Sequence, residues 1–262
     1  MALPIKLFSQ TSASAQVPST TVTVDPGYKI LGGGAVDNYT EPGNMLTASY
    51  PLSLTQWFAA GKNQEVPSAA TVTAYALALY DPNDDWDVII LSGTCAPAHH
   101  PAVVVYLDVV GYVMTGGGAC VNYTGQGNIL TASYPLYSDG DFSGWQAQSK
   151  DQDVSDPASI TAYVIGISQH NKFLDEVQHS ITVGYGAQAA HPSAQAVVES
   201  GYTLCGGGAI DNYTGDGNLL TASCPNDPGP GVQPTYWIGA GKDHLHSDPS
   251  TIAVWAIGIQ LK

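Results

Sequence analysis

The chain contains three closely similar copies of one sequence, and this repeat limits the possible folds more than any other feature. Each copy runs from Gly-Tyr and Gly-Gly-Gly-Ala through Asn-Tyr-Thr, Gly-Asn and Thr-Ala-Ser to a Trp that stands five residues before a Lys. A repeat of about 85 residues that keeps its polar side chains predicts three similar units with three related sites. We place these units at residues 1–83, 84–172 and 173–262.

Strand signals are frequent in every unit, whereas helix signals are scarce. Residues 71–77, 160–165 and 252–257 are rich in β-branched and aromatic residues, which is typical of strands. No segment sustains the apolar spacing of an amphipathic helix. We therefore expect an all-β fold of three homologous antiparallel β units, each a small sandwich, in a pseudo-threefold arrangement. Five or six strands are expected per unit, opening with a hairpin that in the second copy lies near 86–94 and 103–108.

The Gly triplets predict a bulge or a close backbone crossing, where a side chain would clash. A phosphate-binding loop is the rival interpretation, but it needs a following helix, and none is expected. The segment between Thr-Ala-Ser and the Trp varies most in length, and residues 225–237 of the third copy form its longest version. We expect the copies to differ there in what they bind.

Composition and charge exclude some classes of partner. Hydrophobic residues make up 44% of the 262-residue chain and charged residues only 11%, so a mostly neutral polar surface must cover real cores. The net charge is −15, and all seven bases are Lys. Binding to nucleic acid or to an anionic membrane requires a basic surface, so we expect neither. The N-terminal residues lack the apolar region of a signal peptide, which suggests a cytoplasmic protein or a non-classical route of release.

Each repeat contains a Trp that is followed, five residues later, by a Lys. Trp57, Trp145 and Trp237 precede Lys62, Lys150 and Lys242 by five residues, a spacing that puts the two on opposite faces of an extended strand. Each Trp is therefore either a core residue or a platform for a ligand. Three of only seven bases share one repeat position. This indicates a function for the Lys, with a structural ion pair to a neighbouring Asp as the alternative.

A second polar cluster follows each Gly triplet. It consists of an Asn and a Tyr, preceded by Asp in the first and third copies and by Val121 in the second. The Asn either closes a turn through its own side chain or donates to sugar hydroxyls while the Tyr stacks on the apolar face of the sugar. The candidate ligand-binding residues are thus Asp37, Asn38, Tyr39, Trp57, Lys62, Asn122, Tyr123, Trp145, Lys150, Asp151, Asp211, Asn212, Tyr213, Trp237, Lys242, Asp243 and His244.

Catalytic and metal signals are weaker. Lys242, Asp243 and His244 belong to the densest titratable patch, but one copy alone has it and its spacing matches no metal motif. The four cysteines show no Cys-x-x-Cys spacing, and Cys205 and Cys224 are expected to be isolated buried thiols, with a disulfide between them as the alternative. Asp and Asn oxygens could hold Ca²⁺, although no loop has the acidic spacing of a known calcium motif. We expect no cofactor.

The sequence therefore favours multivalent carbohydrate binding without catalysis, with one site per repeat and glycans or glycoconjugates as partners. In arrangement and composition the chain resembles multivalent repeat lectins, and no residue role is taken from that likeness. The alternatives are a polysaccharide lyase or hydrolase that uses one specialised repeat, and a structural or protein-binding module. A homo-oligomer is compatible with each of these functions.

Overall fold

The computed structural model describes residues 3–40, 42–138, 141–170 and 177–262. Within them the chain is all-β, and six strands fall in each of the three ranges predicted for the repeats. The first repeat contains β1 Ile5–Thr11, β2 Ser19–Thr23, β3 Tyr28–Asn38, β4 Asn44–Ser53, β5 Gln56–Asn63 and β6 Thr71–Tyr80. The second contains β7 Trp86–Thr94, β8 Ala102–Tyr106, β9 Val113–Asn122, β10 Ile129–Ser138, β11 Asp141–Lys150 and β12 Ser159–Gln169. The third contains β13 Val177–Ala189, β14 Ser193–Val197, β15 Thr203–Asn212, β16 Leu219–Pro225, β17 Tyr236–Lys242 and β18 Ser250–Leu261.

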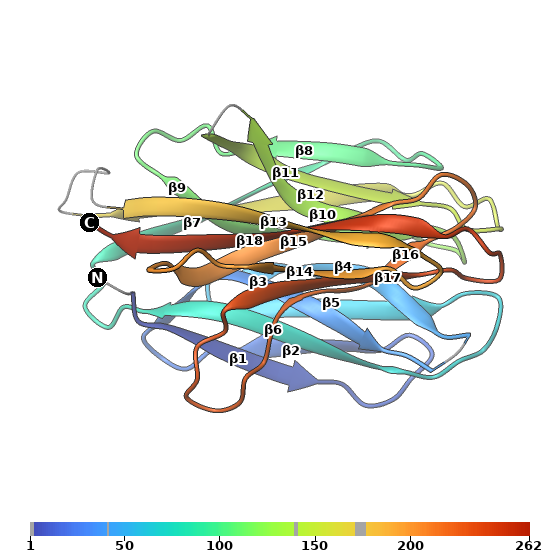
Figure 1. Cartoon of the computed structure of the whole chain (residues 1–262), viewed down its shortest axis with the longest axis horizontal. Helices are drawn as coiled ribbons and strands as arrows, with labels where there is room; N and C mark the ends of the chain where they lie inside the picture. Colours follow the sequence, from blue (N-terminus) through green and yellow to red (C-terminus); the bar gives the residue numbers. More distant parts are fainter. Residues whose placement is uncertain (1–2, 41, 139–140, 171–176) are drawn as a thin grey trace.

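The eighteen strands form three six-stranded antiparallel sheets (Figure 1), and every sheet is shared by two repeats. Their strand orders are β1-β6-β3-β16-β17-β14, β2-β5-β4-β9-β12-β7 and β13-β18-β15-β10-β11-β8. Each repeat is thus a sandwich of two three-stranded layers, and each layer continues edge to edge into a layer of a different repeat. This cyclic sharing gives the three units their pseudo-threefold arrangement.

The predicted opening hairpin is wrong, although its two strands exist. β7 lies at the edge of one sheet and β8 at the edge of another, and the first and third repeats divide β1 from β2 and β13 from β14 in the same way. The chain crosses from one layer of the sandwich to the other after the first strand. Sequence alternation cannot show to which layer a strand goes.

The Gly triplets have the structural role that the sequence predicts, and each of the three positions has its own reason to lack a side chain. The first glycines meet around the pseudo-threefold axis, where a Cβ on Gly32 would lie 2.4 Å from the carbonyl oxygen of Cys205. The second lies against the Trp of its own repeat, and a Cβ on Gly117 would be 2.3 Å from Trp145. The third passes under a strand of another repeat, as Gly34 does beneath Ser223. A register shift also interrupts the ladder at the start of each triplet.

Short stretches of strand pairing, each including an Ala and a Ser, join the repeats. The Ala after each Gly triplet pairs with the Ser of a Thr-Ala-Ser segment in another repeat, in the pairs Ala35–Ser223, Ala119–Ser49 and Ala209–Ser133. One main hydrophobic cluster extends through all three repeats.

The free thiols of Cys205 and Cys224 are buried, which confirms that they form no disulfide. None of the described residues forms a helix with the length and apolar character needed to span a membrane.

Candidate functional site at the junctions between repeats

The repeated Lys side chains connect neighbouring repeats. Lys62, Lys150 and Lys242 stand at or near the ends of β5, β11 and β17, and their exposed fractions are only 3%, 1% and 0%. Each ammonium crosses to another repeat and donates a hydrogen bond to a backbone carbonyl there. The acceptors are Gln126, Asp216 and Pro42, respectively. The side chain that the sequence could have placed on the surface therefore lies inside a contact between repeats.

The repeated Tyr is the second partner of each ammonium. The Nζ atom of Lys62 lies 4.2 Å from the ring centroid of Tyr123, Lys150 lies 4.7 Å from Tyr213, and Lys242 lies 4.6 Å from Tyr39. A cation over an aromatic ring is stabilised by the electron-rich face of the ring, and this attraction is stronger when water is excluded. We call these three Lys–Tyr contacts, with the residues around them, junction 1–2, junction 2–3 and junction 3–1, after the repeats that they join.

Burial of the ammonium groups changes their acidity. Desolvation lowers the pKa of Lys62 to about 8, although the carboxylates of Asp156 and Asp151 oppose the shift. Desolvation also lowers the pKa of Lys150 against several opposing aspartates. A buried cation costs free energy unless carbonyl groups and aromatic rings replace its water shell. The junctions supply both.

The repeated Asn residues bind their own repeat. The Nδ2 atom of Asn38 donates to the hydroxyls of Thr71 and Thr73 at 3.0 and 3.1 Å. Asn122 makes the same pair of bonds with Ser159 and Thr161, and Asn212 donates to Thr251 at 3.2 Å. The Asn thus ties β3, β9 or β15 to the closing strand, rather than closing a turn. All three Asn residues are exposed at the surface beside a partly exposed Tyr.

Two residues beyond each Lys, a buried polar side chain forms a ring with its counterparts. Gln64 donates to the carbonyl of Gln152, Gln152 donates to the carbonyl of His244 at 2.9 Å, and Nε2 of His244 lies 3.0 Å from the carbonyl of Gln64. Burial lowers the pKa of His244, so this imidazole is neutral at neutral pH. The third-repeat histidine, which the sequence suggested as a ligand or catalytic group, therefore has a place in a threefold hydrogen-bonded ring.

Asp37 and Asp211 lie behind the junctions and are each only 2% exposed. Desolvation raises the pKa of each carboxyl to about 7, against the attraction of Lys242 for Asp37 and the hydrogen bond from Ser250 to Asp211. Neither oxygen of Asp37 has a hydrogen-bond partner among the described residues, nor does Oδ2 of Asp211. These groups are too deep to contact a ligand at the surface.

Asp151 and Asp243 hold the loops beside the junctions. Asp151 accepts hydrogen bonds from Asn128, from His99 and from the backbone of Asp156, at 2.6, 2.6 and 2.9 Å. Asp243 accepts from Asn218 at 2.7 Å and from the backbone of Asp248 at 3.1 Å. The two carboxylates therefore do not pair with the repeated Lys, which was the alternative that the sequence offered. They fix the turn that follows it.

The three repeated Trp residues belong to the core. Trp57, Trp145 and Trp237 are at most 1% exposed, and each indole N–H donates to the Ser of its own Thr-Ala-Ser segment at 3.0–3.1 Å. A buried indole needs a partner for its N–H group, and this Ser supplies it. The rings are enclosed on the Gly-triplet side as well, so a ligand at the surface does not reach them.

The sequence did not single out two exposed histidines that complete two of the junctions. Nδ1 of His191 lies 3.3 Å from the hydroxyl of Tyr39, and Nδ1 of His100 lies 3.1 Å from that of Tyr213. Val17 holds the equivalent position in the first repeat, so junction 1–2 has no such histidine. Both histidines precede a Pro at one repeat position, and this shared position was the signal that could have revealed them.

Within the described ranges, no group of three or more His, Cys, Asp or Glu side chains is placed to hold a metal ion. The junctions instead combine exposed Asn and partly exposed Tyr side chains with buried ammonium groups. No protein-family model matches the chain, and no curated protein matches it either.

Proposed function

We propose that the protein binds neutral glycans without catalysis, one at the outer rim of each junction. The observation that carries this proposal is that every junction has a partly exposed Tyr next to an exposed Asn, and that this pair occurs three times. Junctions 2–3 and 3–1 add an exposed imidazole from a second repeat. Saccharides offer C–H faces and hydroxyl edges together, which aromatic rings and neutral polar groups match.

The buried charges support the rim in this proposal and do not contact the sugar. A Lys ammonium behind each Tyr holds the ring in place, since the cation lies 4.2–4.7 Å from its centroid. A preorganised ring loses less conformational freedom when a ligand binds. Of the residues that the sequence suggested, the proposed contact set is Asn38, Tyr39, Asn122, Tyr123, Asn212 and Tyr213.

Three sites on one rigid body would act together on a surface that carries many glycans. Individual sites of this shallow kind bind weakly, and linking them raises apparent affinity by roughly 10²–10⁴ when the spacing of the target fits. A purely structural module is the competing interpretation, because the repeated polar groups also hold the repeats together. The two interpretations differ in what a change at the exposed rim does.

A glycan array with labelled protein tests the proposal, with and without a chelator. We expect selective binding to one class of neutral glycan and no effect of the chelator. Replacing the three junction tyrosines by Phe, singly and together, removes the hydroxyl and leaves the ring over the ammonium. Apparent affinity should fall stepwise with each substitution while thermal stability changes little.

Tyr185 provides the matched control, because it is 79% exposed on β13 and lies in no junction. Tyr185→Phe should bind the array like the unmodified protein. An array without signal, or a triple Phe variant that binds as well as the parent, would overturn the proposal and favour the structural module.

A further inference from the structure

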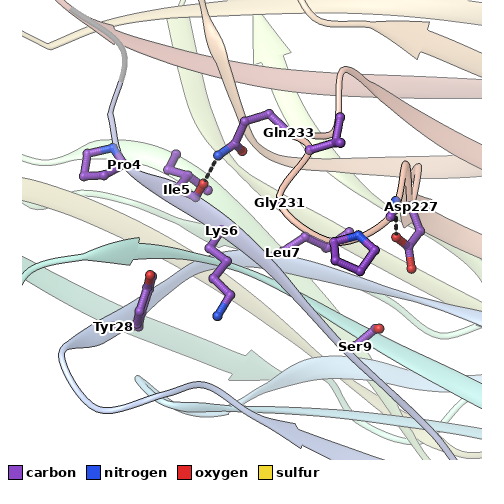
Figure 2. Close-up of a pocket in the computed structure, with 12 residues that line it drawn as sticks. Pro4, Ile5, Lys6, Leu7, Ser9, Tyr28, Asp227, Gly231 and Gln233 are labelled. Carbon is purple, nitrogen blue, oxygen red and sulfur yellow. Dashed lines mark hydrogen bonds between the residues drawn. The ribbon is translucent and has the colours of Figure 1, made fainter.

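A cavity of about 550 Å³ lies between the first strand and the long loop of the third repeat, and no junction residue is among those that line it. Ile5, Leu7 and Ser9 of β1 line one side, and Asp227, Gly231 and Gln233 of the loop line the other. Figure 2 shows the loop passing along β1 with Gln233 directed at Ile5. The volume is within the range of sites that hold organic ligands. The loop is the longest form of the segment that varies in length between the repeats.

The wall formed by β1 is an open sheet edge. β1 is the first strand of its sheet, and among the described strands it pairs only with β6. The backbone of Tyr80 donates to Pro4 and that of Ser12 donates to Val72, so the even-numbered residues of this ladder direct their backbone groups toward β6. Antiparallel pairing alternates, and the odd-numbered residues therefore direct their N–H and C=O groups away from β6, toward the cavity.

One of these outward carbonyls already accepts a hydrogen bond from an amide. The side-chain N–H of Gln233 donates to the carbonyl oxygen of Ile5, in the place where the backbone of an added strand would donate. The next two outward residues are Leu7 and Ser9. In the part of the chain that the structure describes, their backbone groups make no hydrogen bond on the outward side.

The loop leaves room along this edge. Gly229 and Gly231 adopt φ angles of 97° and 77°, which a glycine reaches without strain. A Cβ built on either glycine would meet no atom within 4 Å, so this part of the loop stands away from the rest of the molecule. A groove with free backbone donors and acceptors on one wall and an open loop on the other accepts an extended chain better than a compact ligand.

Charge restricts the occupant further. The carboxylate of Asp227 is on an exposed residue of the loop, whereas the ammonium of Lys6 is already paired with Asp25 at 2.9 Å. The protein as a whole has a net charge of −15. An acidic surface attracts cationic partners and repels anionic ones, and this attraction acts on association before any close contact forms.

We propose that this groove binds an extended, cationic peptide segment of another protein, which adds to β1 as a seventh strand of the sheet. The backbone of Leu7 and Ser9 would exchange hydrogen bonds with the segment, and Asp227 would face its Lys or Arg side chains. This site is separate from the glycan-binding junctions, and neither proposal depends on the other.

The test uses the full chain and an acetylated, amidated hexapeptide of alternating Val and Lys. Two further versions carry N-methyl groups on alternate amides, each on a different edge of the extended peptide. We expect saturable binding of the parent peptide and slower amide hydrogen exchange at Leu7 and Ser9. Methylation of one edge should abolish binding, while methylation of the other edge should leave it within about threefold, because only one edge of an added strand bonds to the sheet.

The protein variant Asp227→Asn should weaken binding of the peptide about tenfold at low salt, and Asp108→Asn, which changes an exposed carboxylate of the second repeat, should not. Absence of saturable binding at millimolar peptide overturns the proposal. Equal binding of the two methylated peptides, or exchange protection away from β1, overturns it too. Neutral oligosaccharides are added to the complex with the peptide as a competitor. If they displace the peptide, so that amide exchange at Leu7 and Ser9 becomes fast again, the groove binds sugars instead.

Discussion

The second repeat differs from the other two in the residues that surround one buried Asn side chain. Asn128 of the second repeat, like Asn44 and Asn218, is fully buried. The Oδ1 atom of Asn128 accepts a hydrogen bond from Ser149, and Val121 of the same repeat is buried. In the first and third repeats Gly replaces this Ser and Asp replaces this Val. There, among the described residues, the Asn Oδ1 atom has no hydrogen-bond donor.

The comparison shows how two positions change together within one fold. A Cβ on Gly241 would lie 2.0 Å from Oδ2 of Asp211 and 2.8 Å from Oδ1 of Asn218, so the carboxyl occupies the space that Ser149 uses in the second repeat. An ionised Asp211 can only accept hydrogen bonds, as can the neighbouring Oδ1 atom of Asn218. A protonated Asp211 carries an O–H group that can donate. The raised pKa of about 7 agrees with a carboxyl that is neutral over much of the ordinary pH range.

The largest expected effect is on the dependence of stability on pH. Asp37 and Asp211 have folded-state pKa values of about 7, above the ordinary value of 3.8. Between these values the folded state binds more protons than the unfolded chain, so this contribution is fully present below about pH 4 and is lost as pH rises through 7. The loss is on the order of 4 kcal/mol for each carboxyl.

The double variant Asp37→Asn/Asp211→Asn should match the parent near pH 4 and exceed it in free energy of unfolding at pH 8, as measured by urea titration. Asp108→Asn is the control, since that residue is exposed. If the stability of the variant depends on pH as that of the parent does, Asp37 and Asp211 are not protonated in the folded state near pH 7. The second repeat would then not differ from the other two in its electrostatics.

The exchange of residues between repeats comes next in size. Gly241→Ser alone places a side chain against Asp211 and should destabilise the protein by roughly 2–3 kcal/mol. Adding Asp211→Val reproduces the arrangement of the second repeat and should recover most of that loss, with a coupling energy of about 2 kcal/mol. Unfolding in urea at pH 7 measures all four members of the cycle. Additive effects would show that the two positions do not share the space.

The reverse change in the second repeat should have a smaller effect. Ser149→Gly removes the donor to Asn128 and supplies no carboxyl in its place. Leaving a buried acceptor unpaired costs about 1–3 kcal/mol. Ser149→Ala should cost a similar amount, because it also removes the hydroxyl, and a much milder Ala variant would attribute the loss to glycine flexibility instead. Thermal unfolding at pH 5, where the two Asp carboxyls are neutral, isolates this effect.

The exposed rims should respond least in stability. Val17→His gives junction 1–2 the imidazole of the other two junctions, and His191→Val removes it from junction 3–1. Both positions are exposed, so each change should shift the free energy of unfolding by less than about 0.5 kcal/mol. If the rims bind glycans, Val17→His should raise apparent affinity and His191→Val should lower it. Equal affinities of both variants and the parent would show that the histidines do not contact the glycan.

Much of the fold followed from local pattern. Alternating β-branched and aromatic residues predicted the closing strands, and the repeat predicted three similar units. The Gly triplets predicted close backbone crossing because a residue without a side chain has few other uses in a strand. The opening hairpin failed for a definite reason: β7 and β8 are successive strands of one repeat but complete different sheets. Their sequences indicate that each is a strand, but they do not indicate the strand with which each one pairs.

The candidate site was harder to read than the fold. The shared position of Lys62, Lys150 and Lys242 showed that these residues have a common task. Their contacts with Tyr123, Tyr213 and Tyr39 connect residues of different repeats and follow no sequence spacing. The Trp could be core or platform by sequence alone, and only the Ser partner and the enclosing glycine decide in favour of the core.

The sequence by itself determined the all-β character, the threefold repetition and the residues that must serve one purpose in every copy, because strand propensity and steric need act within a few residues. Only the tertiary structure decided which repeats share a sheet, which carbonyl and ring receive each buried ammonium, and which side chains remain at the surface. Those choices depend on contacts between segments far apart in the chain, where burial and the pairing of polar groups are settled by the neighbours that folding brings together.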